Sequence, residues 1–215
     1  MIIDCISDLH GHYPKLDGGD LLIIAGDLTA RDTEKDWLDF EIWICEQEYR
    51  EKIIIFGNHD NFLNSIDEHK IWRYWDKVGV TYLCDSVTEF HGLKIWGSPW
   101  SLTFPGINPK CTAFTGTEEE LEQKYALIPD DIDILITHGP PYGILDKVEN
   151  RNVGSRSLAV KIGHMENPPK LWICGHIHEC YGEDFFIRDK PCRIINASHV
   201  NEYYQPVNKL IRVIL

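Results

Sequence analysis

The stretch that decides the fold of this chain is KIIIFGNHDNF, residues 52–62. Its three isoleucines and phenylalanine are typical of a strand that is buried on both faces. The apolar run ends abruptly in Gly57, Asn58, His59 and Asp60. A polar turn after a single strand is most often only a solvated loop. In this chain the same combination recurs at several strand ends, which favours a functional interpretation.

Four more apolar runs end in the same way. Each delivers carboxylates or imidazoles directly after its last apolar residues: Ile2–Ile6 leads to Asp8 and His10, Leu21–Ala25 to Asp27, Ile132–Thr137 to His138, and Leu171–Cys174 to His176 and His178. The carboxyl ends of strands in an open α/β sheet converge on one edge, where ligand sites form. We therefore expect these side chains and Asn58 to lie together.

The spacing within the motifs supports a common site. Asp8 and His10 are two residues apart, so their side chains point to the same side of an extended chain. The histidines at 176 and 178 repeat this spacing. In three motifs a glycine comes just before the polar residues and lets the backbone approach a site closely: Gly26, Gly57 and Gly175.

The chemistry of these side chains indicates metal binding. Imidazole nitrogens with carboxylate and amide oxygens, and no thiolate, are a ligand set for borderline to hard divalent ions. Seven candidate ligands are too many for one tetrahedral ion. They suit two ions about 3.5–4 Å apart that share a bridging carboxylate. We expect two divalent metal ions, with Mn²⁺ favoured and Fe, Zn, Co or Mg as alternatives.

The periodicity of the rest of the chain predicts an α/β protein. Helices are expected over Thr33–Tyr49, Asn61–Lys77, Thr117–Leu127 and Ser155–Met165, and further strands over Val80–Leu83, Leu93–Trp96, Arg193–Ile195 and Leu210–Leu215. Strand and helix alternate in the first half, as in β-α-β units. The length of 215 residues suits one domain, and we expect residues 1–215 to form a single domain.

Composition narrows the classes of partner. The net charge of -13 repels the phosphate backbone of nucleic acid and anionic membrane surfaces. We therefore expect a small phosphorylated substrate, with no extended nucleic acid and no membrane as partners. The seven cysteines form no C-x-x-C pair, and the N-terminus resembles no signal peptide. These features favour a cytoplasmic protein with reduced thiols, while the oligomeric state is not predicted.

The five motifs together resemble a known family. D-x-H, G-D, G-N-H-D, a histidine before Gly-Pro, and G-H-x-H occur in this order from Asp8 to His178, which is similar to the calcineurin-like metallophosphoesterases. The segments HGLKIWGSPW, DILITHGPPYGILD and INASHVNEYYQPVN resemble its small single-domain subgroup, which includes the animal metallophosphoesterase-domain-containing proteins. The resemblance implies a four-layer α/β/β/α sandwich of two mixed β-sheets flanked by helices.

The resemblance also implies how the ligands divide. One ion would be bound by Asp8, His10, Asp27 and His178, and the other by Asp27, Asn58, His138 and His176, so that Asp27 bridges. His59 would then be no ligand but the imidazole near the leaving group. Asp60 has two open interpretations: it orients His59 as a hydrogen-bond acceptor, or it caps the helix that follows.

The resemblance and the ligand chemistry lead to one main hypothesis. A metal-bridging hydroxide would attack a phosphodiester, with cyclic nucleotides as one substrate class, and protonated His59 would donate to the departing oxygen. Substrate contacts are expected from Asn58, His59 and Arg31. A phosphomonoesterase or a protein phosphatase on the same metals is the alternative. A non-catalytic binding scaffold of this fold is a further one, and the intact ligand set disfavours it.

Overall fold

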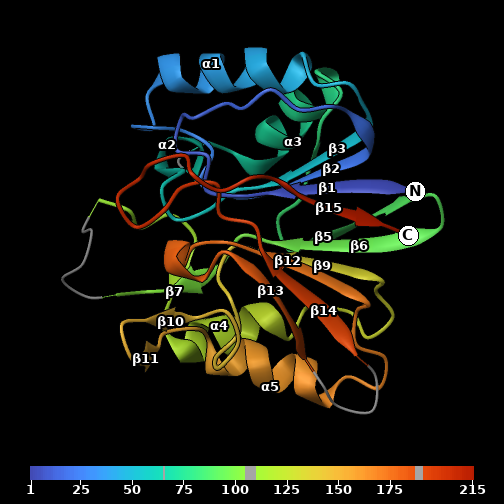
Figure 1. Cartoon of the computed structure of the whole chain (residues 1–215), viewed down its shortest axis with the longest axis vertical. Coiled ribbons are helices and arrows are strands. Elements are labelled where there is room, and N and C mark those ends of the chain that lie inside the picture. Colours follow the sequence, from blue (N-terminus) through green and yellow to red (C-terminus); the bar gives the residue numbers. More distant parts are fainter. Residues whose placement is uncertain (65, 105–109, 187–190) are drawn as a thin grey trace.

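The computed structural model of the chain describes residues 1–64, 66–104, 110–186 and 191–215. Two β-sheets lie face to face in the middle of the molecule, and helices cover the outer face of each sheet, as Figure 1 shows. The expected four-layer α/β/β/α sandwich of two mixed sheets is therefore confirmed.

The first sheet has five strands in the order β15-β1-β2-β3-β4. Its members are β1 (Ile2–Ile6), β2 (Gly19–Ala25), β3 (Tyr49–Ile55), β4 (Thr81–Tyr82) and β15 (Ile211–Ile214). Strands β1 to β4 pair in parallel, and only the edge strand β15 is antiparallel to its neighbour. The carboxyl ends of β1, β2 and β3 therefore meet at one edge of this sheet.

The second sheet has six strands in the order β13-β14-β12-β9-β6-β5. Its members are β5 (Ser86–Phe90), β6 (Leu93–Ser98), β9 (Ile134–Thr137), β12 (Leu171–Cys174), β13 (Gly182–Phe186) and β14 (Cys192–Asn196). The four central strands are parallel, and both edge strands are antiparallel. A parallel bridge between Ser7 and Ser198, which follow β1 and β14, joins the two sheets beside the strand ends.

The helices and the short strands complete the fold. The helices are α1 (Glu34–Cys45), α2 (Asn61–Asn64), α3 (Glu68–Lys77), α4 (Glu118–Tyr125), α5 (Arg156–His164) and the 3₁₀ turn η1 (His178–Cys180). Two small two-stranded sheets pair β7 (Ser101–Leu102) with β8 (Thr115–Gly116), and β10 (Lys147–Val148) with β11 (Arg151–Asn152). No helix among the described residues is long and apolar enough to cross a membrane.

Three apolar layers hold the sandwich together. One lies between the sheets, where alternate residues of the strands interdigitate, among them Ile23, Ile53 and Ile136. The other two lie under the helices. Trp37, Phe40 and Trp75 pack α1 and α3 on the first sheet, and Leu121, Tyr125, Leu158 and Trp172 lie between the second sheet and α4 and α5. Burial on both faces explains why the central strands read as continuous apolar runs.

The boundaries of two expected helices were wrong. The helix expected over Thr33–Tyr49 ends at Cys45, because Tyr49 already begins β3. The helix expected over Asn61–Lys77 is two helices, and α3 has its own cap, Asp67, whose carboxylate accepts from the N–H of Lys70. The helices expected at Thr117 and Ser155 are confirmed, and the hydroxyls of both residues are the caps.

Candidate metal centre

All seven predicted ligands lie beyond the carboxyl ends of parallel strands. Asp8 and His10 follow β1, Asp27 follows β2, Asn58 follows β3, His138 follows β9, and His176 and His178 follow β12. The structure brings ligand atoms together in three overlapping groups, and in each group the ligand atoms of all three residues lie within 4.8 Å of one another. The groups are Asp8, His10 and His178; His10, Asp27 and His59; and Asp27, His138 and His176. The convergence expected from the strand ends is thus present in the structure.

The backbone at the site is held in an unusual conformation. Asp8, His10, Asp27 and His176 have φ values of 50°, 42°, 54° and 68°, in the left-handed region that non-glycine residues seldom adopt. Such conformations cost about 1–3 kcal/mol each and cluster at functional sites. The neighbouring structure must therefore stabilise these turns, which direct the side chains inward.

The glycines before the ligands leave space that the site requires. A Cβ at Gly57 would overlap the carboxylate of Asp27 and lie 2.7 Å from Nε2 of His138. A Cβ at Gly175 would overlap the carboxylate of Asp8 in the same way. These positions therefore need glycine because ligand side chains from other strands pack directly against their backbone.

Asp27 lies at the centre of the site. Its Oδ2 is 3.4 Å from Nε2 of His138 and 3.6 Å from Nε2 of His10. Its Oδ1 accepts a hydrogen bond of 2.9 Å from the backbone N–H of His59. The carboxylate therefore faces imidazoles from both sheets, which is the position that a bridging ligand requires.

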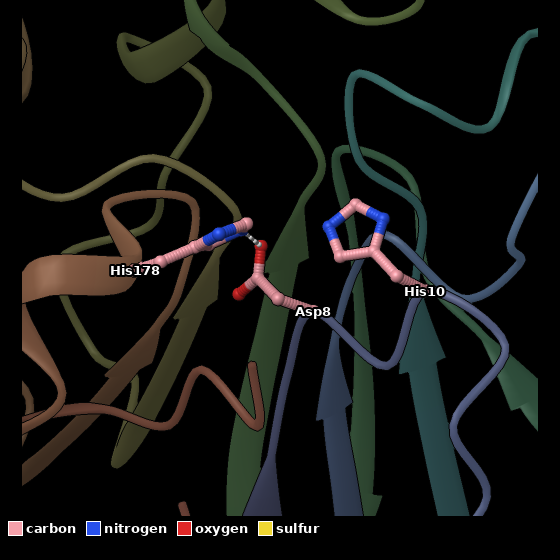
Figure 2. Close-up of side chains that lie close together, drawn as sticks. All are labelled: Asp8, His10 and His178. Atoms are coloured by element: carbon pink, nitrogen blue, oxygen red, sulfur yellow. Dashed lines mark hydrogen bonds and ion pairs between the residues drawn. The ribbon is translucent and has the colours of Figure 1, made fainter. Parts of the chain in front are cut away.

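Asp8 is surrounded by hydrogen-bond donors. Its Oδ1 lies 3.2 Å from Nε2 of His178, and Figure 2 shows His178 and His10 on two sides of this carboxylate. Its Oδ2 accepts from the backbone N–H of His176 at 2.9 Å and from the hydroxyl of Ser198 at 2.9 Å. The sequence interpretation did not include Ser198, which comes from the segment after β14 and fixes the carboxylate from the second sheet.

Among the ligands expected for the second ion, two acceptor atoms face each other. Oδ1 of Asn58 and Nε2 of His138 are 2.9 Å apart, and Nδ1 of His138 lies 2.8 Å from the carbonyl of Ala25. Since Nδ1 donates to this carbonyl, Nε2 of a neutral imidazole has only a lone pair to offer. With the amide oxygen in this position, a proton or a cation between Nε2 and Oδ1 satisfies both atoms. A metal ion bound by both atoms is one such cation.

Two further nitrogens provide the strongest test of whether metal ions fit this site. Nε2 of His10 and Nε2 of His176 are buried and have no hydrogen-bond partner among the described residues. Burial lowers the pKa of His10 to about 4 and that of His176 to about 3, so both imidazoles are neutral at physiological pH. A neutral imidazole with a free lone pair is the form that binds a metal ion, and divalent ions fit the residues present.

The pKa values around the carboxylates of Asp8 and Asp27 also favour a cation at this site. Burial disfavours a charge on Asp27, but the imidazoles of His138, His59 and His10 together outweigh this effect and hold the pKa of Asp27 well below its usual range. Conversely, Asp27 raises the pKa of His138 to about 9 against the effect of burial. Burial also opposes the charge on His178, yet its hydrogen bond to Asp8 raises the pKa of this imidazole. Positive charge is therefore favoured beside both carboxylates.

His59 differs from the other imidazoles in its exposure. Its side chain is 20% exposed, against 4% for His10 and 0% for His138. Its Nε2 lies 3.9 Å from Oδ2 of Asp27, and its ring contacts the ring of His10 at 4.7 Å. His59 therefore reaches the metal centre from the side of the open cleft, which fits a residue that faces the substrate.

Asp60 has neither of the roles expected from the sequence. Its carboxylate is fully buried and accepts from the backbone N–H groups of Gly57 at 2.7 Å, Asp27 at 3.1 Å and Leu28 at 3.1 Å. The N–H of Phe62, in the helix that follows, instead donates to Asp32 at 2.6 Å. Asp60 therefore joins the loop after β2 to the loop after β3 and does not orient His59.

A cleft of about 430 Å³ opens over the metal centre. Apart from site residues and their neighbour Ile177, its walls consist of Phe104, Val148, Val153, Glu179, Glu202 and Tyr204. None of the described residues that line it is a lysine or arginine, and Arg31, a predicted substrate contact, is exposed and not among them. Tyr204, which the sequence analysis did not single out, packs against His10 at 4.8 Å and His178 at 5.3 Å.

Comparisons with known proteins agree with this geometry. Residues 1–180 match the family described as calcineurin-like phosphoesterase. The human metallophosphoesterase domain-containing protein 1 is 33% identical over 231 residues, which cover 95% of this chain and 68% of that protein. A UPF0046 protein of Caenorhabditis elegans is 31% identical over 201 residues, or 83% of this chain and 69% of its own length.

A solved structure shows the same fold. The crystal structure of TT1561 of Thermus thermophilus has a TM-score of 0.61 to this chain at 16% identity, and the match covers 91% of this chain and 88% of the other. The family match over residues 1–180 and the 33% identity to the human protein show the family. The chain belongs to the calcineurin-like phosphoesterases, a family of metal-dependent phosphoric ester hydrolases.

Proposed function

We propose that the protein hydrolyses small phosphodiesters with the help of two divalent ions that share Asp27. The observation that carries this proposal is the overlap of the ligand groups at Asp27, whose Oδ2 lies between Nε2 of His10 and Nε2 of His138. One ion would be held by Asp8, His10, Asp27 and His178, and the other by Asp27, Asn58, His138 and His176. Mn²⁺ suits the oxygen ligands of this set, and the imidazoles also suit Fe or Zn.

Ions bound at this site would supply electrophilic chemistry. Such ions polarise phosphoryl oxygens and lower the pKa of coordinated water, and they attract a phosphate to a chain whose net charge is -13. The protein's own residues do the positioning. Asp8 and Asp27 supply the negative charge that retains the ions, and Asn58 contributes a neutral oxygen, so that the site keeps a net positive charge for the substrate.

His59 is suited to handle the proton of the leaving group. Its backbone is fixed by the bond to Asp27, and its ring faces the open cleft. In the protonated form, Nε2 can donate to the departing ester oxygen, a contribution worth about 10²–10⁴-fold in rate. Because substrates with acidic leaving groups need little protonation, the contribution of His59 should depend on the leaving group.

The walls of the cleft favour a diester over a monoester. A monoester dianion carries one more charge than a diester, and its free oxygens are usually bound by an arginine. The described lining has no such cation but carries Glu179 and Glu202, which repel extra negative charge. Phe104, Val153 and Tyr204 instead offer apolar surface to the second organic group that only a diester has. A cyclic nucleotide is also a diester with one negative charge, and its base could lie against this apolar surface.

The proposal is tested by comparing matched substrates. Bis(p-nitrophenyl) phosphate and p-nitrophenyl phosphate share a leaving group, so their kcat/KM values at one pH and one Mn²⁺ concentration report diester against monoester preference. We expect the diester to be favoured. A clear preference for the monoester would overturn the diesterase assignment and favour the phosphomonoesterase alternative.

A further inference from the structure

A cysteine contacts the imidazole that faces the substrate. Sγ of Cys111 lies 3.4 Å from Nδ1 of His59, within hydrogen-bond reach for sulfur. Among the described residues, Nδ1 of His59 has no other hydrogen-bond partner. Within the described part of the chain, the thiol is therefore the group in a position to orient this imidazole through Nδ1, since the adjacent carboxylate of Asp60 accepts from backbone N–H groups instead.

The segment that carries Cys111 is tied to the segment of His59. The side-chain amide of Asn61 donates to the carbonyl of Lys110 at 3.0 Å and accepts from the N–H of Thr112 at 3.2 Å. The same amide donates to the carbonyl of His59 at 3.3 Å. One side chain thus fixes the residues on both sides of Cys111 against the backbone of His59, which places the thiol at Nδ1.

The remaining contacts of His59 determine how this thiol affects the orientation and the proton of the imidazole. The backbone N–H is bound to Oδ1 of Asp27, the ring packs against His10, and Nε2 lies on the side of the metal centre. A thiol can donate through S–H and can also accept. In the neutral imidazole whose ring proton lies on Nε2, Nδ1 accepts from S–H. With a charged imidazole, Nδ1–H donates to Sγ, and Nε2 again carries a proton.

A neutral thiol suits this position. Burial raises the pKa of Cys111, which favours the protonated form. A neutral partner holds the imidazole without adding a negative charge beside a phosphate substrate. A carboxylate at the same place would add that charge.

We infer that Cys111 is a positioning residue for catalysis, which holds His59 in the orientation and tautomer that present an Nε2 proton to the leaving group. The inference rests on the proposed function of His59. The contact between Cys111 and His59 also makes the site sensitive to modification of this thiol, because a group attached to Sγ would occupy the space at Nδ1.

The kinetic test uses Cys111→Ala and Cys111→Ser, with the exposed Cys45→Ala as the control. For diphenyl phosphate, whose phenolate leaves poorly, kcat should fall by about three- to ten-fold in the alanine variant, the loss of one weak hydrogen bond, and less in the serine variant. For bis(p-nitrophenyl) phosphate, kcat should stay unchanged, and KM and metal content should stay unchanged throughout. An equal loss on both substrates would overturn the inference.

A double-mutant cycle separates a role through His59 from a general packing effect. In a His59→Ala background, Cys111→Ala should cost nothing further with diphenyl phosphate, because the thiol then has no imidazole to position. An additive loss would contradict the inference. If the wild-type protein hydrolyses no phosphodiester at all, the proposed function fails. The next measurement still tests the contact between Cys111 and His59, because it needs no activity.

That measurement reads the histidine directly. In Zn²⁺-loaded protein with ¹⁵N-labelled histidine, long-range ¹H–¹⁵N correlation spectra show which ring nitrogen carries the proton. We expect the Nε2–H tautomer for neutral His59 in the wild type and in Cys111→Ser, and a mixture of tautomers in Cys111→Ala. An Nδ1–H tautomer in the wild type, or identical spectra in the wild type and the alanine variant, would refute the role of Cys111.

Discussion

Oδ2 of Asp27 lies 3.4 Å from Nε2 of His138, although the two residues follow strands of different sheets. Asp27 extends from β2 in the first sheet and His138 from β9 in the second. The metal centre therefore forms across the junction of the two halves of the sandwich. Loss of either residue is expected to disturb the centre without removing the apolar core below it.

The bridging role of Asp27 predicts an effect on both ions. Asp27→Asn removes the negative charge that faces His10 and His138, so metal content after reconstitution in excess Mn²⁺ should fall below one ion per chain. His10→Ala should weaken chiefly one ion, because the structure places His10 beside Asp8 and Asp27 but in no group with His176. Elemental analysis of both variants checks this. Retention of two ions by Asp27→Asn would contradict the bridge.

Asp60 is predicted to stabilise the loops that carry the ligands. Its two oxygens accept three backbone N–H groups, whereas an asparagine has one oxygen and turns an NH₂ group toward a donor. Asp60→Asn should therefore lower the free energy of unfolding by about 1–3 kcal/mol, measured by urea denaturation. Asp130→Asn, at an exposed ion pair with Lys161, is the control and should change little. Equal stability of the two variants would show that the three bonds contribute nothing.

Gly57 is predicted to accept no side chain. An alanine Cβ would overlap the carboxylate of Asp27 and crowd Nε2 of His138, so Gly57→Ala should lose most of its bound metal. The control is Gly92→Ala, where nothing lies within 4 Å of the new Cβ but φ is +77°. This control costs about 1–2 kcal/mol of backbone strain and should keep its metal. Normal metal content in Gly57→Ala would refute the close packing.

The pKa of His138 predicts opposite pH trends for stability and metal binding. Asp27 raises this pKa from 6.5 to about 9. In protein stripped of metal by chelation, the stabilisation from this pair is complete below about pH 6.5 and is lost as the pH rises through about 9. Metal must displace the proton from Nε2, so Mn²⁺ affinity should increase by about ten-fold per pH unit for each proton released. Calorimetry in two buffers of different ionisation enthalpy counts these protons. An Mn²⁺ affinity that does not change from about pH 6.5 to 8.5 would contradict the coupling between metal binding and proton release from His138.

Much of the fold could be predicted because burial leaves a direct trace in the sequence. Residues 53–55 and 134–136 are all isoleucine or leucine, since both faces of their strands are covered there. Strands β5 and β13 left no such trace. They are edge strands with exposed or half-buried residues such as Val87 and Glu183, so their pattern resembles that of loops.

The site shows the same division between local and tertiary information. Asp8, Asp27 and His138 could be predicted because each directly follows a buried strand. Cys111 and Tyr204 could not, because their place in the cleft depends on how distant loops fold back over the strand ends. Tyr204 lies in the segment INASHVNEYYQPVN, which resembles the family subgroup, but the spacing there does not single out this tyrosine.

The central claim is that two ions sharing Asp27 act together, and metal titration tests it most directly. Metal-stripped protein is titrated with Mn²⁺, and bound metal per chain and the rate with bis(p-nitrophenyl) phosphate are measured on the same samples. We expect the rate to appear only as the second ion binds, with saturation at two ions per chain. Full activity at a reproducible single ion per chain would contradict the claim.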